Sequence, residues 1–237
     1  MTQVNYDVAQ STDDAGDIGS LSITFDDNDV YYWLATSDSG TATTSGWRFQ
    51  SVAVPQGATI DSASFTLSTW NIKGFGNSVS TCWGVDADDL DTWSSGANRP
   101  KDATKTTASD TMTLKGGSDI SNGVYVARSF DVTTIVQEIV DRGGWSSGAD
   151  MGFICTTGAG HGLGNTLRAF TYDAYGGGAY PYPHLTINYT SAAGTNFQIN
   201  IGDSWHAVEG MQINIGDTWK AAAGAQVNIG DAWKTIF

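Results

Sequence analysis

The chain has 237 residues, with 25 acidic and 11 basic side chains and a formal net charge of −14. Such a charge repels the phosphate backbone, and no run approaches the ~20 apolar residues of a membrane span, so we expect neither a nucleic-acid nor a membrane partner. The length allows one large β-domain or one domain with an appendage, and the 29 glycines favour short strands joined by tight turns.

The N-terminal residues are polar and do not resemble a targeting segment. Residues 1–6 lack the basic start and the apolar core of a signal peptide. We therefore expect a protein that stays in the cytosol or leaves it by lysis or as part of a particle. A first strand is expected at 3–9, and Asp13, Asp14 and Asp17 predict a turn or a mobile arm.

Alternation of apolar and polar residues predicts the strands that follow. In the clearest case, residues 47–54 form one strand, 55–57 form a turn, and Ala63, Phe65 and Leu67 form the buried face of the next strand. Further strands are expected at 21–25, 30–35, 79–85, 112–114, 124–130, 151–156, 167–172 and 184–189. About nine to eleven short strands predict an all-β fold, a jelly-roll β-sandwich, rather than alternating βα layers.

An acidic segment follows the strand at 79–85. Its carboxylates can supply oxygen ligands to Ca²⁺, but the segment lacks the glycine and the distal Glu of an EF-hand loop. A solvated acidic loop and a calcium site both stay open as interpretations of Asp86, Asp88, Asp89 and Asp91. We expect no metal and no other cofactor, and residues 94–110 predict a long surface excursion.

The chain has two cysteines, Cys82 and Cys155, and each lies in an apolar strand-like run. Buried free thiols are the default at such positions. A disulfide between strands is the alternative, which the sequence does not decide.

One segment, 130–145, predicts the single helix of the sandwich. Its apolar stripe consists of Ile135, Val136, Ile139 and Val140. Asp131 or Thr133 can cap the N-terminus, glycines 143–144 end the helix, and Trp145 can anchor that end. Because so short a helix is not stable alone in water, we expect it to lie across a sheet.

The C-terminal part contains a repeat. A sandwich domain at 1–190 is followed by a linker at 191–195 and by three 14-residue repeats at 196–237. Each repeat predicts a strand, a two-residue Gly-Asp turn and a second strand, and one such hairpin is marginal by itself. We therefore expect the repeats to pack against one another or against other copies, through Trp205, Trp219, Trp233, Ile201, Ile215 and Ile229.

The sequence contains no convergent set of catalytic residues, so we expect a protein without enzymatic activity. Aromatic side chains in glycine-rich or acidic loops are the better candidates for a binding site. Their flat faces can stack on sugar rings, although aromatic side chains that fold inward to hold the loops in place are equally consistent with the pattern. The glycan-binding candidates are Trp93, Tyr175, Tyr180 and Tyr182.

Three segments in order carry a resemblance to a known group of domains: Trp47-Arg-Phe with the following Val54-Pro-Gln-Gly-Ala-Thr-Ile, Phe130-Asp-Val-Thr-Thr-Ile-Val, and Pro183-His-Leu-Thr-Ile-Asn-Tyr. Residues 45–190 resemble DNRLRE-type and carbohydrate-binding-module-like jelly rolls of bacterial extracellular proteins. The resemblance implies a non-catalytic jelly roll used for adhesion or polysaccharide binding. The C-terminal units are similar to short tandem repeats at the ends of tailed-phage structural proteins.

Together these resemblances imply a virion structural protein, such as a head decoration, neck or fibre component. Its expected partners are other copies of the chain, with a trimer favoured, and other virion proteins. The alternative is a free carbohydrate-binding module or adhesin that recognises a surface polysaccharide.

Overall fold

The computed structural model describes residues 1–18, 23–24, 31–33, 43–73, 78–94, 98–114, 125–157, 166–173 and 182–191, and six short strands between 198 and 235. The chain divides into two compact units, Met1–Ser191 and Ala192–Phe237, and each is described by itself. Within the described residues, no α-helix combines the length and the apolar composition needed to cross a bilayer.

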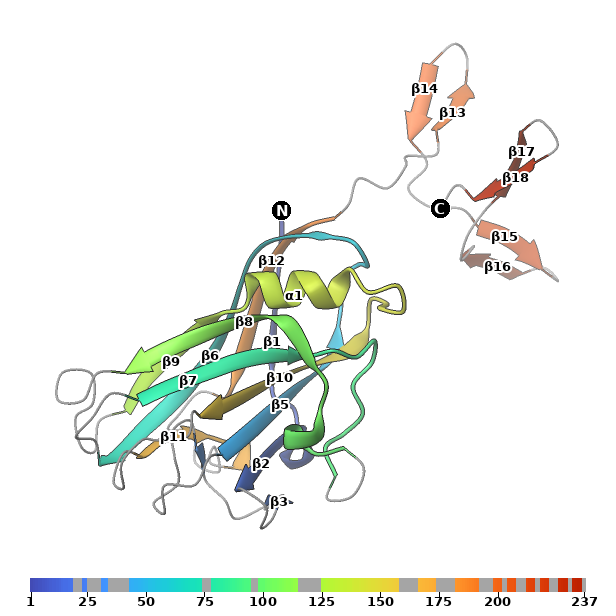
Figure 1. Ribbon diagram of the computed structural model, residues 1–237. Coiled ribbons are helices and arrows are strands. Elements are labelled where there is room, and N and C mark those ends of the chain that lie inside the picture. Colours follow the sequence, from blue (N-terminus) through green and yellow to red (C-terminus); the bar gives the residue numbers. More distant parts are fainter. Residues whose placement is uncertain are drawn as a thin grey trace. The chain divides into compact units, whose positions relative to one another are not determined.

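The first unit consists of two antiparallel sheets and one short α-helix among its described residues (Figure 1). Sheet 1 has the order β1-β12-β6-β11-β4, with β9 also paired to β6. Its strands are β1 (Thr2–Asp7), β4 (Tyr31–Trp33), β6 (Thr59–Lys73), β9 (Tyr125–Asp131), β11 (Thr166–Phe170) and β12 (His184–Thr190). The prediction of an all-β sandwich with one short helix is confirmed.

Sheet 2 has the order β3-β2-β5-β10-β7-β8. Its strands are β2 (Asp14–Ile18), β3 (Ile23–Thr24), β5 (Thr43–Val52), β7 (Ser78–Val85), β8 (Lys105–Leu114) and β10 (Ala149–Thr157). The remaining elements of this unit are the 3₁₀ helices η1 (Ser11–Asp13) and η2 (Pro100–Asp102) and the α-helix α1 (Thr133–Val140). The predicted surface excursion at 94–110 is wrong, because it contains η2 and the first half of β8.

The core lies between the two sheets and is centred on aromatic rings. Phe65 of β6 lies 5.3 Å from the ring of Trp47 and 5.3 Å from that of Phe153, both on sheet 2. Phe49 and Phe130 complete the cluster at centroid distances of 5.7 and 6.4 Å from Phe65. These side chains come from alternate strand positions, as the sequence pattern predicted, and aromatic pairs of this kind add to the energy of burial.

Helix α1 lies across one end of the sandwich (Figure 1) and contacts both sheets. All four residues of its predicted apolar stripe are buried. The helix approaches β7 closely at Gly84, where an added Cβ would lie 2.7 Å from Cγ2 of Ile135. The predicted N-cap at Asp131 or Thr133 is wrong, because Val132 occupies that position without a side-chain capping bond. Asp131, one residue earlier, accepts the backbone N–H of Thr133 at 3.0 Å and its hydroxyl at 2.6 Å.

The polar side chains of α1 bond to the backbone of sheet 1. Gln137 accepts the N–H of Ile60 at 2.8 Å and donates to the carbonyl oxygen of Ala58 at 3.0 Å. The hydroxyl of Thr133 accepts the N–H of Ala63 at 2.9 Å. β9 pairs with β6 only from Ser64 onward. The helix side chains therefore hydrogen-bond to backbone groups at the start of β6, where β9 is not paired with it.

The same helix also bonds to the edge of sheet 2. The two carboxylate oxygens of Glu138 accept the N–H groups of Thr107 and Ala108 on β8, each at 2.7 Å. β8 is the last strand of its sheet, and an edge strand presents backbone groups that have no strand partner. Just beyond the helix, the indole N–H of Trp145 donates to the carbonyl oxygen of Val54 at 2.9 Å.

The predicted N-terminal turn or mobile arm is wrong. Asp13, Asp14 and Asp17 lie in η1 and β2, and all three are buried. Burial of a carboxylate requires a charged or hydrogen-bonding partner. Two arginines distant in sequence supply it for Asp13 and Asp17, whereas Asp14 accepts the backbone N–H of Tyr172 at 2.7 Å. Arg48 forms an ion pair with Asp13, and Arg99 forms one with Asp17.

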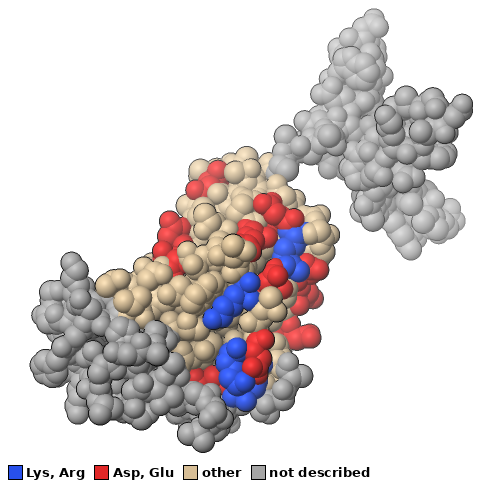
Figure 2. Space-filling model, viewed as in Figure 1, with Lys and Arg blue, Asp and Glu red and all other residues tan. Residues whose placement is uncertain are grey.

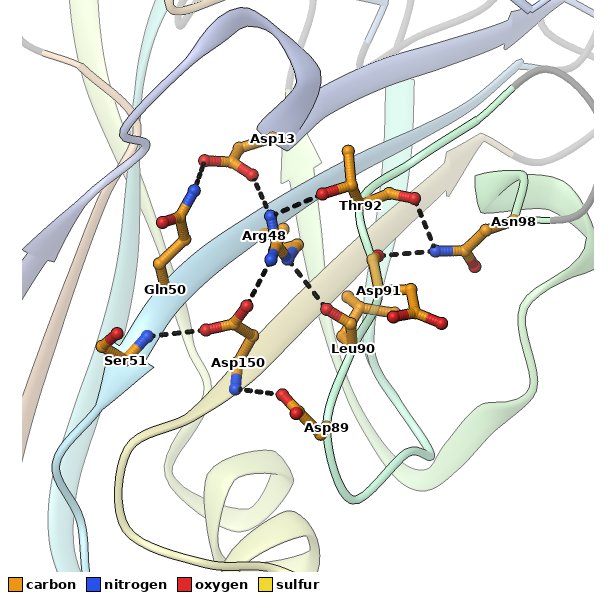
Figure 3. A network of polar contacts seen from close by, with 10 residues as sticks. All are labelled: Asp13, Arg48, Gln50, Ser51, Asp89, Leu90, Asp91, Thr92, Asn98 and Asp150. Atoms are coloured by element: carbon orange, nitrogen blue, oxygen red, sulfur yellow. Dashed lines mark hydrogen bonds and ion pairs between the residues drawn. The ribbon is translucent and has the colours of Figure 1, made fainter.

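Arg48 is the centre of a polar network on β5 (Figure 3). Besides Asp13, its guanidinium forms an ion pair with Asp150. It also donates to the carbonyl oxygen of Leu90 at 2.8 Å and to the hydroxyl of Thr92 at 3.0 Å. The Arg48 side chain is 11% exposed and that of Asp13 is 0% exposed, so this network is largely shielded from water and holds the acidic segment against sheet 2.

The second unit contains three hairpins. Their strands are β13 (Gln198–Ile201), β14 (Ser204–Ala207), β15 (Gln212–Ile215), β16 (Thr218–Ala221), β17 (Gln226–Ile229) and β18 (Ala232–Thr235). Each hairpin forms a two-stranded sheet, and the register is the same in all three: Asn200, Asn214 and Asn228 lie opposite Trp205, Trp219 and Trp233.

Replacement of Glu138 tests the contact between the helix and the edge of sheet 2. We expect Glu138→Ala to leave two backbone N–H groups without their acceptor and to lower the free energy of unfolding by about 2 kcal/mol. The melting temperature should then fall by about 4–8 °C in a calorimetric scan. Thr134→Ala, at an exposed position of the same helix, is the control and should leave the melting temperature unchanged. Equal melting of both variants and the parent would contradict this role.

Replacement of Arg48 tests the buried network. Arg48→Met keeps the length of the side chain but leaves the buried carboxylate of Asp13 without its charge partner, so we expect a loss of about 3–5 kcal/mol in urea unfolding. Lys101→Met removes an exposed ion pair with Asp102 and should cost at most about 1 kcal/mol. A similar loss in the two variants would show that Arg48 contributes no more than a surface charge.

Candidate functional site

The structure places Trp93 inside the fold. Its side chain is 2% exposed and belongs to a small second core on the outer side of sheet 2, together with Ala15, Val85, Leu90 and Ile154. The ring lies against β5, because a Cβ on Gly46 would be 2.8 Å from its Cζ2 atom. The prediction of Trp93 as part of an exposed sugar-stacking platform is therefore wrong, and the inward-folded alternative holds for this residue.

Tyr182 is half-buried and stacks on Tyr172, with ring centroids 5.2 Å apart and an interplanar angle of 12°. One face of Tyr182 is thus covered by another tyrosine. These two residues flank the glycine-rich segment 174–181. The other two predicted platform residues, Tyr175 and Tyr180, lie outside the described residues.

The carboxylates of the acidic segment are engaged within the protein. Asp86 and Asp88 form ion pairs with Arg142, and a carboxylate oxygen of Asp89 accepts the N–H of Asp150 at 2.8 Å. The fourth calcium candidate, Asp91, is exposed. In the part of the chain that the structure describes, no three His, Cys, Asp or Glu side chains are grouped around a metal-sized space.

The basic side chains on the described sandwich surface in Figure 2 lie beside acidic ones, whereas several acidic patches have no basic neighbour. On the face shown in Figure 2, the basic side chains touch acidic ones, in agreement with the ion pairs of Arg99 and Arg142. Phosphate backbones are bound by clusters of unpaired basic residues. The described surface of this face does not present such a cluster.

The outer face of sheet 1 carries aligned polar residues. Across β1, β12, β6 and β9, the strand register produces three parallel rows. We call these residues the polar face: Asp7, His184, Thr66 and Ser129; Asn5, Thr186, Ser64 and Asp131; Gln3, Asn188 and Ser62. Intervening residues such as Phe65 and Ile187 point to the core and are buried.

Hydrogen bonds between neighbouring strands hold the polar face in place. Asn188 donates to the hydroxyl of Ser62 at 3.0 Å, and Thr186 donates to the side-chain oxygen of Asn5 at 3.0 Å. The hydroxyls of Thr66 and Ser129 lie 2.7 Å apart. Because short side chains fixed in this way lose little freedom on binding, the face is preorganised for a ligand.

A groove of about 360 Å³ opens on the polar face next to the start of α1. This volume is near the lower end of the range of small-ligand sites, about 300–1,000 Å³. Its lining is formed by Ser62, Ala63, Ser64, Ser129, Phe130, Asp131, Thr133 and Asn188. Hydroxyl, amide and carboxylate groups therefore meet at one place, where they can both donate and accept hydrogen bonds.

Asp131 is the charged group of this groove. The hydroxyl and the backbone N–H of Thr133 bond to its carboxylate and lower the pKa of Asp131. The carboxylate thus remains ionised at a lower pH than an ordinary Asp and acts as a fixed hydrogen-bond acceptor. Transfer of a proton from a bound molecule to this group is disfavoured for the same reason.

The sequence contains a signal for the polar face, and this signal lies in hydroxyl residues and not in the predicted aromatic residues. Ser62, Ser64 and Thr66 alternate with the buried residues Ala63 and Phe65, so their outward orientation follows from the strand period. The alignment of these positions with β12 and β9 depends on pairings between distant segments, which the strand period does not reveal.

Comparison with known proteins gives distant structural similarities. No family model and no curated protein sequence matches the chain. Among solved structures, the chain is similar to a carbohydrate-binding module of family 61 in complex with β-1,4-galactotriose, with 9% sequence identity and a TM-score of 0.26. The similarity covers 71% of this chain and 83% of that one. None of these comparisons supports the resemblance of the C-terminal units to phage repeats.

Proposed function

We propose that the protein is a non-catalytic binding protein whose sandwich holds a neutral surface polysaccharide on the polar face. The observation that carries this proposal is the alignment of hydroxyl, amide and carboxylate side chains in two rows across four strands and a third row across three. A polysaccharide repeats its hydroxyl groups along an extended chain, so a flat face with repeated donors and acceptors can bond to several of them at once.

The charge of the face selects the class of glycan. The polar face contains no Lys or Arg, and its one basic side chain, His184, has Nδ1 2.6 Å from a carboxylate oxygen of Asp7. Asp131 stays ionised in the groove. A polymer that carries uronate or sulfate groups would be repelled by these carboxylates, whereas a neutral sugar can donate its hydroxyl protons to them.

The composition of the face favours a glycan over a protein partner. Binding energy at protein interfaces is concentrated in Trp, Tyr and Arg side chains, and none of these residue types occurs among the residues of the polar face. Net contributions of about 0.5–1.5 kcal/mol per hydrogen bond correspond to weak binding by a single site. Several linked copies would bind a repetitive polymer far more tightly through avidity.

A second function is proposed for the C-terminal repeats, namely attachment in an oligomer, with a trimer favoured. The observation in its favour is that the three hairpins have strands of four residues each and the same register. A single two-stranded hairpin of this kind is marginally stable in water, so each unit gains stability from contact with another surface. We propose a virion as the location, where the chain would be a head decoration, neck or fibre component.

Affinity electrophoresis with soluble polysaccharides tests the glycan proposal. We expect the protein to be retarded in gels that contain a neutral polysaccharide and to migrate freely with an anionic one. Ser64→Arg places a long side chain across the groove, and we expect it to weaken retardation at least about tenfold. The matched control, Thr113→Arg, adds the same charge at an exposed position of sheet 2 and should bind like the parent.

Two results would reject the glycan proposal. One is free migration of the parent protein through every neutral polysaccharide of a broad panel. The other is unchanged retardation of the Ser64→Arg variant, provided that its melting curve shows a folded protein.

Native mass spectrometry of the full chain tests the role of the repeats. We expect an oligomer for the parent and monomers when Trp205, Trp219 and Trp233 are all replaced by Ala, because the largest apolar groups of the hairpins are lost. The control replaces the next residue of each hairpin, His206, Lys220 and Lys234, by Ala and should leave the mass of the assembly unchanged. A monomeric parent would dismiss the attachment role.

A further inference from the structure

The two cysteines of the chain lie directly opposite each other in sheet 2. Cys82 on β7 and Cys155 on β10 are register partners in an antiparallel pair. Both belong to the core between the sheets, with exposed fractions of 0% and 1%, and both are free thiols. The prediction of buried free thiols is confirmed. Whether the alternative, a disulfide, can also form depends on the distance between the two paired positions.

The geometry of this pair is compatible with a bond. Residues opposite each other in an antiparallel sheet have Cα atoms about 4.5–5.5 Å apart, which is within the range of about 4.4–6.8 Å that disulfides span. The two side chains project from the same face of sheet 2 into one core cluster, because directly opposite residues of a strand pair share a face. The Cys82 thiol in turn donates to the carbonyl oxygen of Trp83 at 3.9 Å. The pairing of the two strands thus already places both cysteines at a backbone separation that a disulfide can span.

We propose that Cys82 and Cys155 form an intramolecular disulfide when the protein passes from reducing to oxidising surroundings. The oxidant is a low-molecular-weight disulfide. One cysteine attacks it as the thiolate and releases one thiolate of the reagent, which leaves a mixed disulfide on the protein. The second cysteine then attacks the protein sulfur and releases the other half. The two cysteines lose two protons and two electrons, and the reagent becomes two thiols.

The disulfide links β7 and β10, two adjacent inner strands of sheet 2. The bond closes a loop of about 70 residues, and a loop of this length removes much of the freedom of the unfolded chain. The reaction on the folded protein is slow, because burial and the hydrogen bond with Cys82 raise the pKa of the Cys155 thiol and the thiolate is the reacting form. The disulfide therefore forms slowly on the folded protein, and it does not depend on the proposed glycan function.

Thiol counting on the full chain tests this inference. The reduced protein is incubated with oxidised glutathione in the folded state, and a second sample is refolded from urea in the same buffer. After unfolding and alkylation, we expect mass spectrometry to show no alkylated cysteine and a cross-link between Cys82 and Cys155 within one chain. The melting temperature of the oxidised protein should rise by about 10 °C over the reduced form.

The Cys155→Ala variant is the control, since it leaves Cys82 without a partner. Its melting temperature should be the same with and without oxidant. Two alkylated cysteines after both treatments of the parent would overturn the inference, as would a cross-link between two chains. A disulfide that forms in only one of the two samples supports it and shows by which route the bond closes.

Discussion

Helix α1 provides the hydrogen-bond acceptors and donors that two sheet edges would otherwise need from further strands. Gln137 and Thr133 bond to β6 of sheet 1, and Glu138 bonds to β8 of sheet 2. The apolar stripe of the same helix is buried against the core of the sandwich. A single short element thus closes the sandwich both by packing and by satisfying exposed backbone, which an edge strand left open would not achieve.

The balance of charge inside the fold explains the character of its surface. Arg48, Arg99 and Arg142 all form ion pairs with aspartates. The chain has 11 basic residues against 25 acidic ones. Because these three arginines are already paired with aspartates, the remaining acidic side chains give the surface an excess of negative charge. That excess disfavours anionic partners and is compatible with neutral ones. The ligand class proposed for the polar face follows from this balance as well as from its hydroxyl groups.

The two units suit different physical tasks. The sandwich has a dense aromatic core centred on Phe65, and such a core can support a preorganised outer face on sheet 1. Each C-terminal hairpin, by contrast, is a two-stranded sheet of four-residue strands. An element of that size gains most from contact with a second surface, whereas the sandwich buries its own core. The proposed division between a binding unit and an attachment unit is consistent with these sizes.

The sequence alone determined the period of the strands, the helix and the hairpin repeats. Alternation around Phe65 and the stripe from Ile135 to Val140 are local patterns, and local patterns specify which face of an element is apolar. The tertiary structure decided which polar and aromatic residues are buried when their partners are distant in sequence. Asp13 is buried because Arg48 meets it across 35 positions, and Trp93 is buried because the acidic segment folds back on β5. The polar face likewise exists only through the register of β1, β12, β6 and β9, since pairing between distant strands, rather than the period within one strand, brings its rows together.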